Sequence, residues 1–199
     1  MDTNPAPLNP SPPTVYRSIE DALNNPGQVF SLNLSSQTIT QLPPQISGLV
    51  NLRELDLSFC GLTTLPAEFS ALVNLERLNL YANSLTVLPP EIGKMTNLRE
   101  LNLTANQLIK LPAEIGNLKA LNRLNLYGNS LVEIPAEIGN LTSLTDLTLT
   151  TNRLTKLPPE FGSMTSLVRL DLSNNPLTIL PPEIVHLQNL QIVLPKALK

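Results

Sequence analysis

The sequence predicts an α/β solenoid, which is a stack of coils that each contain one short strand and one short helical segment. Residues 101–118 read LNLTANQLIKLPAEIGNL and residues 124–141 read LNLYGNSLVEIPAEIGNL, so the chain repeats itself with a period of 23 residues. Seven such units run from 29 to 189 without an insertion. Each unit combines two hydrophobic periods, one typical of a strand and one typical of a helical turn. Together these observations indicate a repeat architecture with a continuous core.

The first half of each unit predicts a strand with one buried face. Its leucines alternate with polar residues, which is the two-residue period of a strand. Adjacent strands are expected to form one parallel sheet with the leucines inside. Counted in steps of 23, the central leucine column comprises Leu32, Leu55, Leu78, Leu101, Leu124, Leu147, Leu170 and then Val193.

The second half of each unit predicts a short helix or a 3₁₀ turn. Its apolar residues lie three or four apart, as in LIKLPAEIGNL. Pro112 suits the first turn of such a segment because proline fixes φ and lacks an N–H. Glu114 places a carboxylate near the positive end of the same turn. Phe69 and Phe161 occupy the isoleucine place of this segment and are expected in the core.

The unit resembles a leucine-rich repeat, whose pattern is Leu-x-x-Leu-x-Leu-x-x-Asn-x-Leu-x-x-Leu-Pro. The LPxEIGxL ending is similar to that of bacterial leucine-rich-repeat proteins, including those of spirochaetes, and to that of Ras-associated scaffolds of animals and plants. The leader YRSIEDALNNPGQVFSLNLS resembles the bacterial kind most. The resemblance implies a right-handed horseshoe with a concave parallel β-sheet and convex 3₁₀ or short-helix turns. It also implies a role in bacterial host interaction or at a cell surface.

The chain divides into four regions. Residues 1–13 are a proline-rich segment expected to lack regular structure, and residues 14–28 are expected to form an N-terminal cap with a helix from about 18 to 25. Ser18 is placed as the N-cap of that helix. Residues 29–189 form the seven repeats, and residues 190–199 begin an eighth repeat that stops. Because this end has no evident cap, we expect weak self-association there.

One polar column marks the turn that follows each strand. An asparagine side chain donates and accepts hydrogen bonds, so it can pair buried backbone groups of its own turn and of the adjacent turn. Cys60 takes this place in the second unit, where a buried structural thiol is expected rather than a nucleophile, since no general base accompanies it. The structural ladder comprises Cys60, Asn83, Asn106, Asn129, Asn152 and Asn175.

Composition and motifs exclude several functions. The net charge is −3 and shows no basic excess, so we expect no nucleic-acid partner, and no apolar run is long enough for membrane insertion. With Cys60 and His186 as the single cysteine and histidine, a Cys/His zinc site within the chain is excluded. There is no nucleophile–base pair and no glycine-rich phosphate loop. We therefore expect a protein that is not an enzyme and has no cofactor.

The outward side chains of the strands form a ladder of alternating charge. Its members are Glu54, Arg77, Glu100, Arg123, Asp146 and Arg169. At a strand spacing of about 4.8 Å each arginine is expected to lie between two carboxylates. This ladder either fixes the strand register or contacts a partner directly, and both roles are compatible. The next outward column, from Asn33 to Asp171, is short and polar and is expected to be a solvated surface.

The aromatic residues of the sheet face carry the functional prediction. Phe59, Tyr81 and Tyr127 are expected to project from the concave face, although the chain has only four Phe, three Tyr and no Trp. With Arg77, Arg123 and Glu100 they are predicted to bind a protein partner of unknown identity, because aromatic residues and arginine dominate binding hot spots. The alternatives are a carbohydrate or cell-surface ligand on the same face, and scattered exposed aromatics that bind nothing.

Localisation depends on the start of the chain. A native Met1 favours the cytoplasm, whereas removal of a signal peptide favours a secreted or surface-exposed protein.

Overall fold

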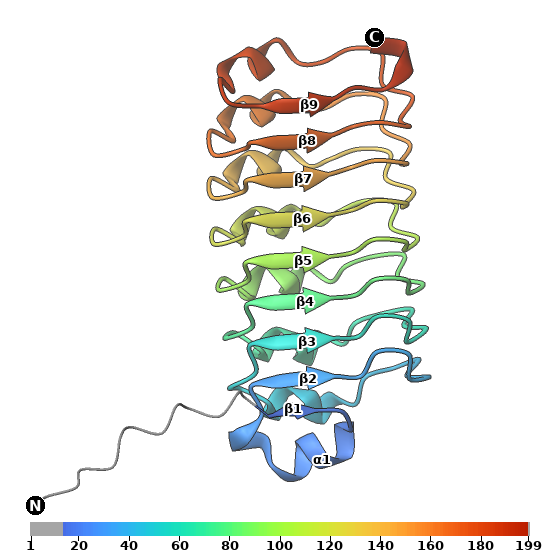
Figure 1. Cartoon of the computed structure of the whole chain (residues 1–199), viewed down its shortest axis with the longest axis vertical. Helices are drawn as coiled ribbons and strands as arrows, with labels where there is room; N and C mark the ends of the chain where they lie inside the picture. The colour runs from blue at the N-terminus through green and yellow to red at the C-terminus, as the bar shows by residue number, and fades with distance from the viewer. Residues whose placement is uncertain (1–13, 199) are drawn as a thin grey trace, which may run out of the picture.

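In the part of the chain that the structure describes, nine short strands lie side by side in one parallel sheet, in chain order (Figure 1). The computed structural model describes residues 14–198; residues 1–13, where the sequence predicts the proline-rich segment, and residue 199 lie outside it. From β2 to β8 each residue pairs with the residue 23 positions later, as Leu55 does with Leu78. The strands are β1 (Val15–Tyr16), β2 (Ser31–Asn33), β3 (Glu54–Asp56), β4 (Arg77–Asn79), β5 (Glu100–Asn102), β6 (Arg123–Asn125), β7 (Asp146–Thr148), β8 (Arg169–Asp171) and β9 (Gln191–Val193).

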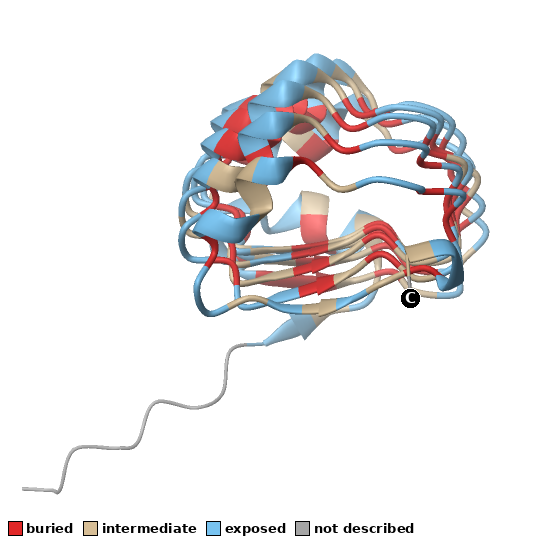
Figure 2. Ribbon diagram, turned by 90° about the horizontal axis from the view of Figure 1, so that it is seen from above, coloured by how far each residue is buried: buried red, intermediate tan, exposed pale blue. Residues whose placement is uncertain are grey.

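Short 3₁₀ turns form the opposite side of every coil, as the sequence predicts. The seven turns from η2 (Pro44–Gly48) to η8 (Pro182–His186) each follow a proline in extended conformation, such as Pro112 at φ −68° and ψ 149°, and end after one tight turn. Figure 2 looks along the stack and shows the strands on one side of the coil and these turns on the other. They are η1 (Pro26–Gln28), η2 (Pro44–Gly48), η3 (Ala67–Ala71), η4 (Pro90–Lys94), η5 (Ala113–Asn117), η6 (Ala136–Asn140), η7 (Pro159–Ser163), η8 (Pro182–His186) and η9 (Lys196–Leu198).

The leucine columns form one core that runs through the stack. Leu78, Leu101 and Leu124 are buried, and so are Phe69 and Phe161 on the opposite side. A single coil cannot enclose its own leucines, so each coil buries them against the coils before and after it. The prediction of an open leucine-rich solenoid is therefore confirmed.

A short helix and an additional strand cover the first coil. Helix α1 (Ile19–Asn24) begins after Ser18, whose side chain accepts a hydrogen bond from the backbone N–H of Asp21. Ala22 is fully buried against the core, with Ile19 and Leu23 packed beside it. Strand β1 pairs in parallel with β2, which extends the sheet by one strand that the sequence analysis did not anticipate.

The last strand is out of the 23-residue register. Leu170 of β8 pairs with Ile192, which is 22 residues later, and Asp171 pairs with Val193. The expected place of Val193 in the leucine column is therefore wrong. Because strand side chains alternate between faces, a step shorter by one residue turns Ile192 inward and leaves Val193 47% exposed.

Glycines allow successive 3₁₀ turns to pack closely. A Cβ added at Gly116 would lie 2.3 Å from the backbone oxygen of Glu137 in the next coil. The equivalent positions Gly93, Gly139 and Gly162 are equally tight against Glu114, Glu160 and Glu183. At the same place in the last turn the chain carries Val185, which is 76% exposed.

We predict that Gly116→Ala lowers the free energy of unfolding by about 2 kcal/mol, because the added methyl group displaces backbone rather than a flexible side chain. Denaturant unfolding followed by circular dichroism measures this change. Gly48→Ala is the matched control, since nothing lies within 4 Å of a Cβ built there. Equal losses in the two variants contradict the packing argument.

Candidate protein-binding surface

Three columns of outward side chains cover the sheet face, which we define as the exposed side of β2–β8 together with the turns that directly follow these strands. The first column is the charge ladder, the second is a row of short amides and carboxylates, and the third contains Tyr81 and Tyr127. The backbone stays in register beyond the strands, because the N–H of Ala82 donates to the carbonyl of Thr104 and that of Ala105 donates to Tyr127. Tyr81, Thr104 and Tyr127 therefore lie on successive coils, about 4.8 Å apart.

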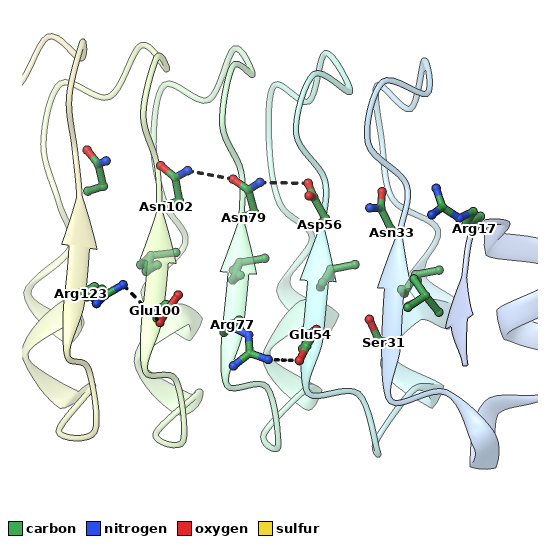
Figure 3. Close-up of a pocket in the computed structure, with 16 residues that line it drawn as sticks. Arg17, Ser31, Asn33, Glu54, Asp56, Arg77, Asn79, Glu100, Asn102 and Arg123 are labelled. Atoms are coloured by element: carbon green, nitrogen blue, oxygen red, sulfur yellow. Dashed lines mark hydrogen bonds and ion pairs between the residues drawn. The ribbon is translucent and has the colours of Figure 1, made fainter. Parts of the chain in front are cut away.

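The charge ladder consists of separate ion pairs. Each arginine pairs with the carboxylate one strand earlier: Arg77 with Glu54, Arg123 with Glu100 at 4.0 Å, and Arg169 with Asp146. Figure 3 shows the first two pairs. The register places Arg77 and Arg123 each between two carboxylates, as expected, but each guanidinium forms an ion pair with only the earlier of the two. About half or more of each arginine side chain stays exposed, so the ladder keeps hydrogen-bond donors facing solvent.

Asp146 is the carboxylate that the ladder affects most. Burial by itself raises its pKa, but hydrogen bonds from Thr145 and Arg169 and the charges of Arg169 and Arg123 outweigh burial and hold the pKa below its usual value. The carboxylate of Asp146 therefore stays ionised to a lower pH than an aspartate without these partners would.

The second column is part of the turns rather than a solvated surface, which corrects the sequence-based expectation. Its side-chain oxygens accept the backbone N–H two residues later, as Asn79 does from Tyr81 at 3.2 Å and Asn125 does from Tyr127 at 3.1 Å. The side chains also bond one another across strands. Asn102 donates to Asn79 and Asn79 donates to Asp56, at 3.0 and 3.1 Å (Figure 3).

The buried asparagines fasten each turn to the previous coil. Asn129 donates to the carbonyl oxygens of Leu103 (2.9 Å) and Leu126 (3.1 Å), and its Oδ1 accepts from the N–H of Leu108 (3.0 Å). The same arrangement recurs at Asn83, Asn106, Asn152 and Asn175. These side chains are buried, so they support the sheet face from beneath and do not face a ligand.

Cys60 fills the asparagine place with a thiol. It is buried, and its Sγ donates to the carbonyl of Leu34 at 3.2 Å. Burial raises the pKa of the Cys60 thiol, which keeps it protonated at neutral pH and makes it a poor nucleophile.

The three aromatic side chains project where the turns begin. Phe59 and Tyr81 meet edge to face, with ring centroids 4.8 Å apart and an interplanar angle of 81°. Phe59 is 54% exposed and Tyr127 is 45% exposed. Thr104 separates Tyr127 from the Phe59–Tyr81 pair, so the structure brings two of the three predicted aromatics into contact and holds the third two coils away.

Phe59 has a left-handed backbone, at φ 56°. The residues beside the third column share this conformation, namely Ser36, Ala82, Ala105, Gly128, Thr151 and Asn174. Glycine adopts positive φ freely, whereas a bulky residue there is strained. Folding stability alone does not favour a half-exposed phenylalanine at this position. The sequence analysis named Phe59 but could not detect the conformation of its backbone.

An open hollow of about 580 Å³ lies on the sheet face in front of β1–β6. Val15 and Arg17 line one end, and Arg123 and Asn125 line the other. Figure 3 shows the charge ladder and the amide row running side by side along it. Among residues 14–198 no three His, Cys, Asp or Glu side chains gather as a metal site would require. No helix within the same range has the length and hydropathy to cross a membrane.

Comparisons with known proteins agree with this architecture. Three family models match the chain: a leucine-rich repeat region at residues 91–175, and leucine-rich repeats at 51–108 and 166–187. The chain is a leucine-rich-repeat protein. No curated protein matches it. Leucine-rich-repeat families are typically non-enzymatic interaction modules.

Solved structures show the same solenoid in bacteria, plants and animals. A leucine-rich-repeat protein of Leptospira interrogans is 35% identical over 90% of this chain and 58% of its own, with a TM-score of 0.65. The ectodomain of the Arabidopsis thaliana receptor kinase GASSHO1/SCHENGEN3, in complex with Casparian strip integrity factor 2, is 35% identical over 85% of this chain and 21% of its own, with a TM-score of 0.71. A chain of the Drosophila Toll–Spätzle complex is 30% identical over 86% of this chain and 24% of its own, with a TM-score of 0.77.

This leucine-rich-repeat chain therefore spans 58% of the length of the Leptospira chain and less of the two receptors. Leucine-rich repeats and these receptor structures point to protein–protein interaction in general.

We predict that Thr151→Gly raises the free energy of unfolding by about 1 kcal/mol. Thr151 is exposed, β-branched and at φ 57°, a conformation that glycine adopts without strain. Thermal or denaturant unfolding measures the change. Thr155→Gly is the control: this exposed threonine has no positive φ, so glycine there is expected to lower stability. A loss of stability in both variants contradicts the argument that the positive φ of Thr151 is strained.

Proposed function

We propose that the protein is a non-enzymatic binding module that holds a protein partner on its sheet face. The observation that carries the proposal is the aromatic group of the sheet face, in which Phe59 and Tyr127 are exposed and Tyr81 is half-buried against Phe59. Exposed aromatics on a rigid surface bury a large area on binding while losing little conformational freedom.

The strained backbone of Phe59 supports this proposal. A residue at positive φ costs about 1–2 kcal/mol unless it is glycine. The edge-to-face contact with Tyr81 returns roughly 0.5–1.5 kcal/mol, so the phenylalanine brings little net stability. Strained residues of this kind gather at ligand-binding sites.

The charge ladder would orient the partner rather than supply most of the affinity. Arg77 and Arg123 are more than half exposed and retain donors beyond their pairs with Glu54 and Glu100. Rim charges of this kind contribute mainly to association rate and specificity. The carboxylate of Glu100, beside Arg123 in the adjacent strand, would repel an acidic group of the partner that binds over β5.

Binding is expected to fall about tenfold or more in Tyr81→Ala and in Tyr127→Ala, because each removes an aromatic ring from the centre of the proposed contact. Affinity capture from a cell extract, followed by quantitative mass spectrometry, compares the proteins retained by each variant and by the native chain. Glu114→Ala, on the opposite side of the coil, is the control and is expected to retain the same proteins. Circular dichroism checks that each variant is folded. If both tyrosine variants retain the same proteins as the native chain, the proposal is contradicted.

Carbohydrate or a cell-surface ligand is the second candidate for the same face. The exposed ring of Tyr127 next to the half-buried amides Asn102 and Asn125 favours it, since sugars stack on aromatic rings and bond to amides. Saturable signals on a glycan array that disappear in Tyr127→Ala would support this ligand over a protein. The similarity to the Leptospira chain supports extending either proposal to a bacterial protein that contacts a host.

We also propose weak self-association at the C-terminal end of the stack. Val185 and Ile179 are 76% and 66% exposed there, and β9 has no neighbour on its outer side among the described residues. Exposed apolar side chains beside an unpaired strand edge are a surface for pairing with a second copy.

The sedimentation coefficient is expected to rise with protein concentration in analytical ultracentrifugation. Val185→Glu is expected to abolish this rise, because it places a charge in the apolar contact. Val73→Glu, at an exposed valine within the stack, is the control and is expected to leave the rise unchanged. A mass that stays monomeric at all concentrations contradicts self-association.

A further inference from the structure

The charge ladder is symmetric about the middle of the sheet. From β3 to β8 its members are Glu54, Arg77, Glu100, Arg123, Asp146 and Arg169. Read backwards, this series carries the opposite charge at every position. The point of reversal lies between β5 and β6, which is also the middle of strands β2–β9. We propose that the sheet face binds a second copy of this chain, with the two stacks antiparallel and related by a two-fold axis between β5 and β6.

A two-fold axis parallel to the strands brings opposite charges face to face. Such an axis reverses the order of the coils and keeps the direction of the strands, so β5 of one copy lies over β6 of the other. The facing pairs, one residue from each copy, are Glu100–Arg123, Arg77–Asp146 and Glu54–Arg169. Because the contact is two-fold, each of these pairs occurs twice. The ladder is therefore complementary to itself.

Each arginine has donors left for such a contact. The guanidinium of Arg123 pairs with Glu100 of its own chain, and that of Arg77 pairs with Glu54. More than half of each arginine side chain is nevertheless exposed. A guanidinium carries five N–H donors, so it can hold one carboxylate of its own chain and one of the second copy. The contact therefore adds ion pairs without breaking those already present.

The ladder also excludes other arrangements of the two copies. A shift by one strand spacing places Arg77 opposite Arg123 of the second copy, and Glu100 opposite its own counterpart. A shift by two spacings restores opposite signs but leaves two charges of each copy facing no charge. A two-fold axis along the ladder brings every charge over its own counterpart. Because like charges that face each other repel, the alternation specifies one register.

Large side chains of the sheet face meet small ones about the same axis. Tyr127 faces Thr104 of the second copy, and Tyr81 faces Thr150. The backbone keeps these positions in register, since the N–H of Gly128 donates to the carbonyl of Thr150. Tyr127 is exposed, whereas both threonines are half-buried and leave room above them. The order of large and small residues therefore supports the same arrangement as the charges.

The sheet face is open and bends little along the stack. Figure 1 looks onto the strands, and none of residues 14–198 lies in front of them. In Figure 2 the strands of successive coils lie nearly behind one another. Glycines such as Gly116 let the 3₁₀ turns on the opposite side pack closely too, which limits the curvature of the stack. Two such faces can approach to about 10 Å, the usual spacing of stacked sheets, which arginine and glutamate side chains span.

The size of the contact predicts reversible association. Strands β2–β9 at about 4.8 Å each, and a width of about 16 Å from the ladder to the tyrosine column, give about 600 Å² on each copy. A stable interface usually buries about 800 Å² on each partner. One facing pair is unfavourable, because Asp56 lies opposite Asp171 of the second copy, although both also accept hydrogen bonds in their own turns. We therefore expect a weak dimer that salt dissociates.

This inference rests on the proposed function, because it names the protein that binds the sheet face. It is separate from the apolar contact at the C-terminal end, since Val185 lies in η8 on the opposite side of the coil. Salt distinguishes the two contacts, because at 1 M the screening length is about 3 Å, which weakens the ladder and not an apolar contact. The Val185→Glu comparison therefore applies at high salt. The ladder is tested at low salt in chains that all carry Val185→Glu.

Charge reversal beside the axis tests the dimer. Arg123→Glu places a carboxylate opposite Glu100 of the second copy, and Glu100→Arg places a guanidinium opposite Arg123. We expect the Kd for self-association to rise about tenfold or more in each variant, because the axis repeats the repulsion. An equal mixture of the two variants restores opposite charges at both central contacts, so we expect it to associate as the native ladder does. Sedimentation velocity of one fluorescently labelled variant, titrated with the other, measures this.

The double variant Glu100→Arg/Arg123→Glu is the matched control. It keeps the net charge and again brings opposite charges together across the axis, so we expect it to self-associate like the native ladder. Circular dichroism checks the fold of every variant. A native ladder that stays monomeric at low salt overturns the proposal, and so does a mixture that associates no better than either single variant. A monomer leaves the proposed function standing, because capture of a different protein from a cell extract does not require a second copy.

Discussion

Each coil of this protein is completed by its neighbours, because one strand and one 3₁₀ turn cannot enclose the leucines that they carry. Most of the remaining structure follows from packing coils at the spacing of a parallel sheet. Leu78 and Leu101 are buried only because the strands on either side cover them. Asn129 bonds the carbonyl of Leu103 because the previous turn lies within reach at this spacing. For the same reason position 116 is a glycine, since the next coil occupies the space that a Cβ would need.

The same spacing makes the sheet face a regular surface. Side chains in one column are held a strand apart, so their identity can change while their position does not. The ladder uses this regularity to form ion pairs such as Arg123–Glu100. These pairs balance the charge of the sheet face, and their side chains remain exposed to solvent. Phe59 and Tyr81 use it differently, because Phe59 has a left-handed backbone and its ring meets that of the tyrosine in the next coil edge to face. A frame that tolerates this strain can present aromatic side chains to a ligand at little loss of stability.

The two ends of the stack are not equivalent. At the first coil, Ser18 begins a helix that buries Ala22 against the core, and β1 protects the edge of β2. At the last coil, a step of 22 residues turns Ile192 inward and leaves Val193 exposed, and Val185 is exposed as well. The outer side of the last coil therefore keeps exposed valine side chains, whereas a helix and a strand cover the first coil.

The sequence by itself determined the repeat, the parallel sheet, the 3₁₀ turns, the Ser18 cap and the leucine core, because periodic columns report burial directly. It also indicated which residues project from the sheet face, including Tyr81 and Tyr127. The tertiary structure decided what depends on the relative position of two coils. It paired each arginine with one carboxylate and placed Val193 outside the core. It also made the side chains of Asn79 and Asn125 hydrogen-bond acceptors for the backbone of the following turns. It also gave Phe59 a left-handed backbone. None of these can be derived from one sequence column, because a hydrogen bond, a close contact or a φ angle is set by the distance between neighbouring coils.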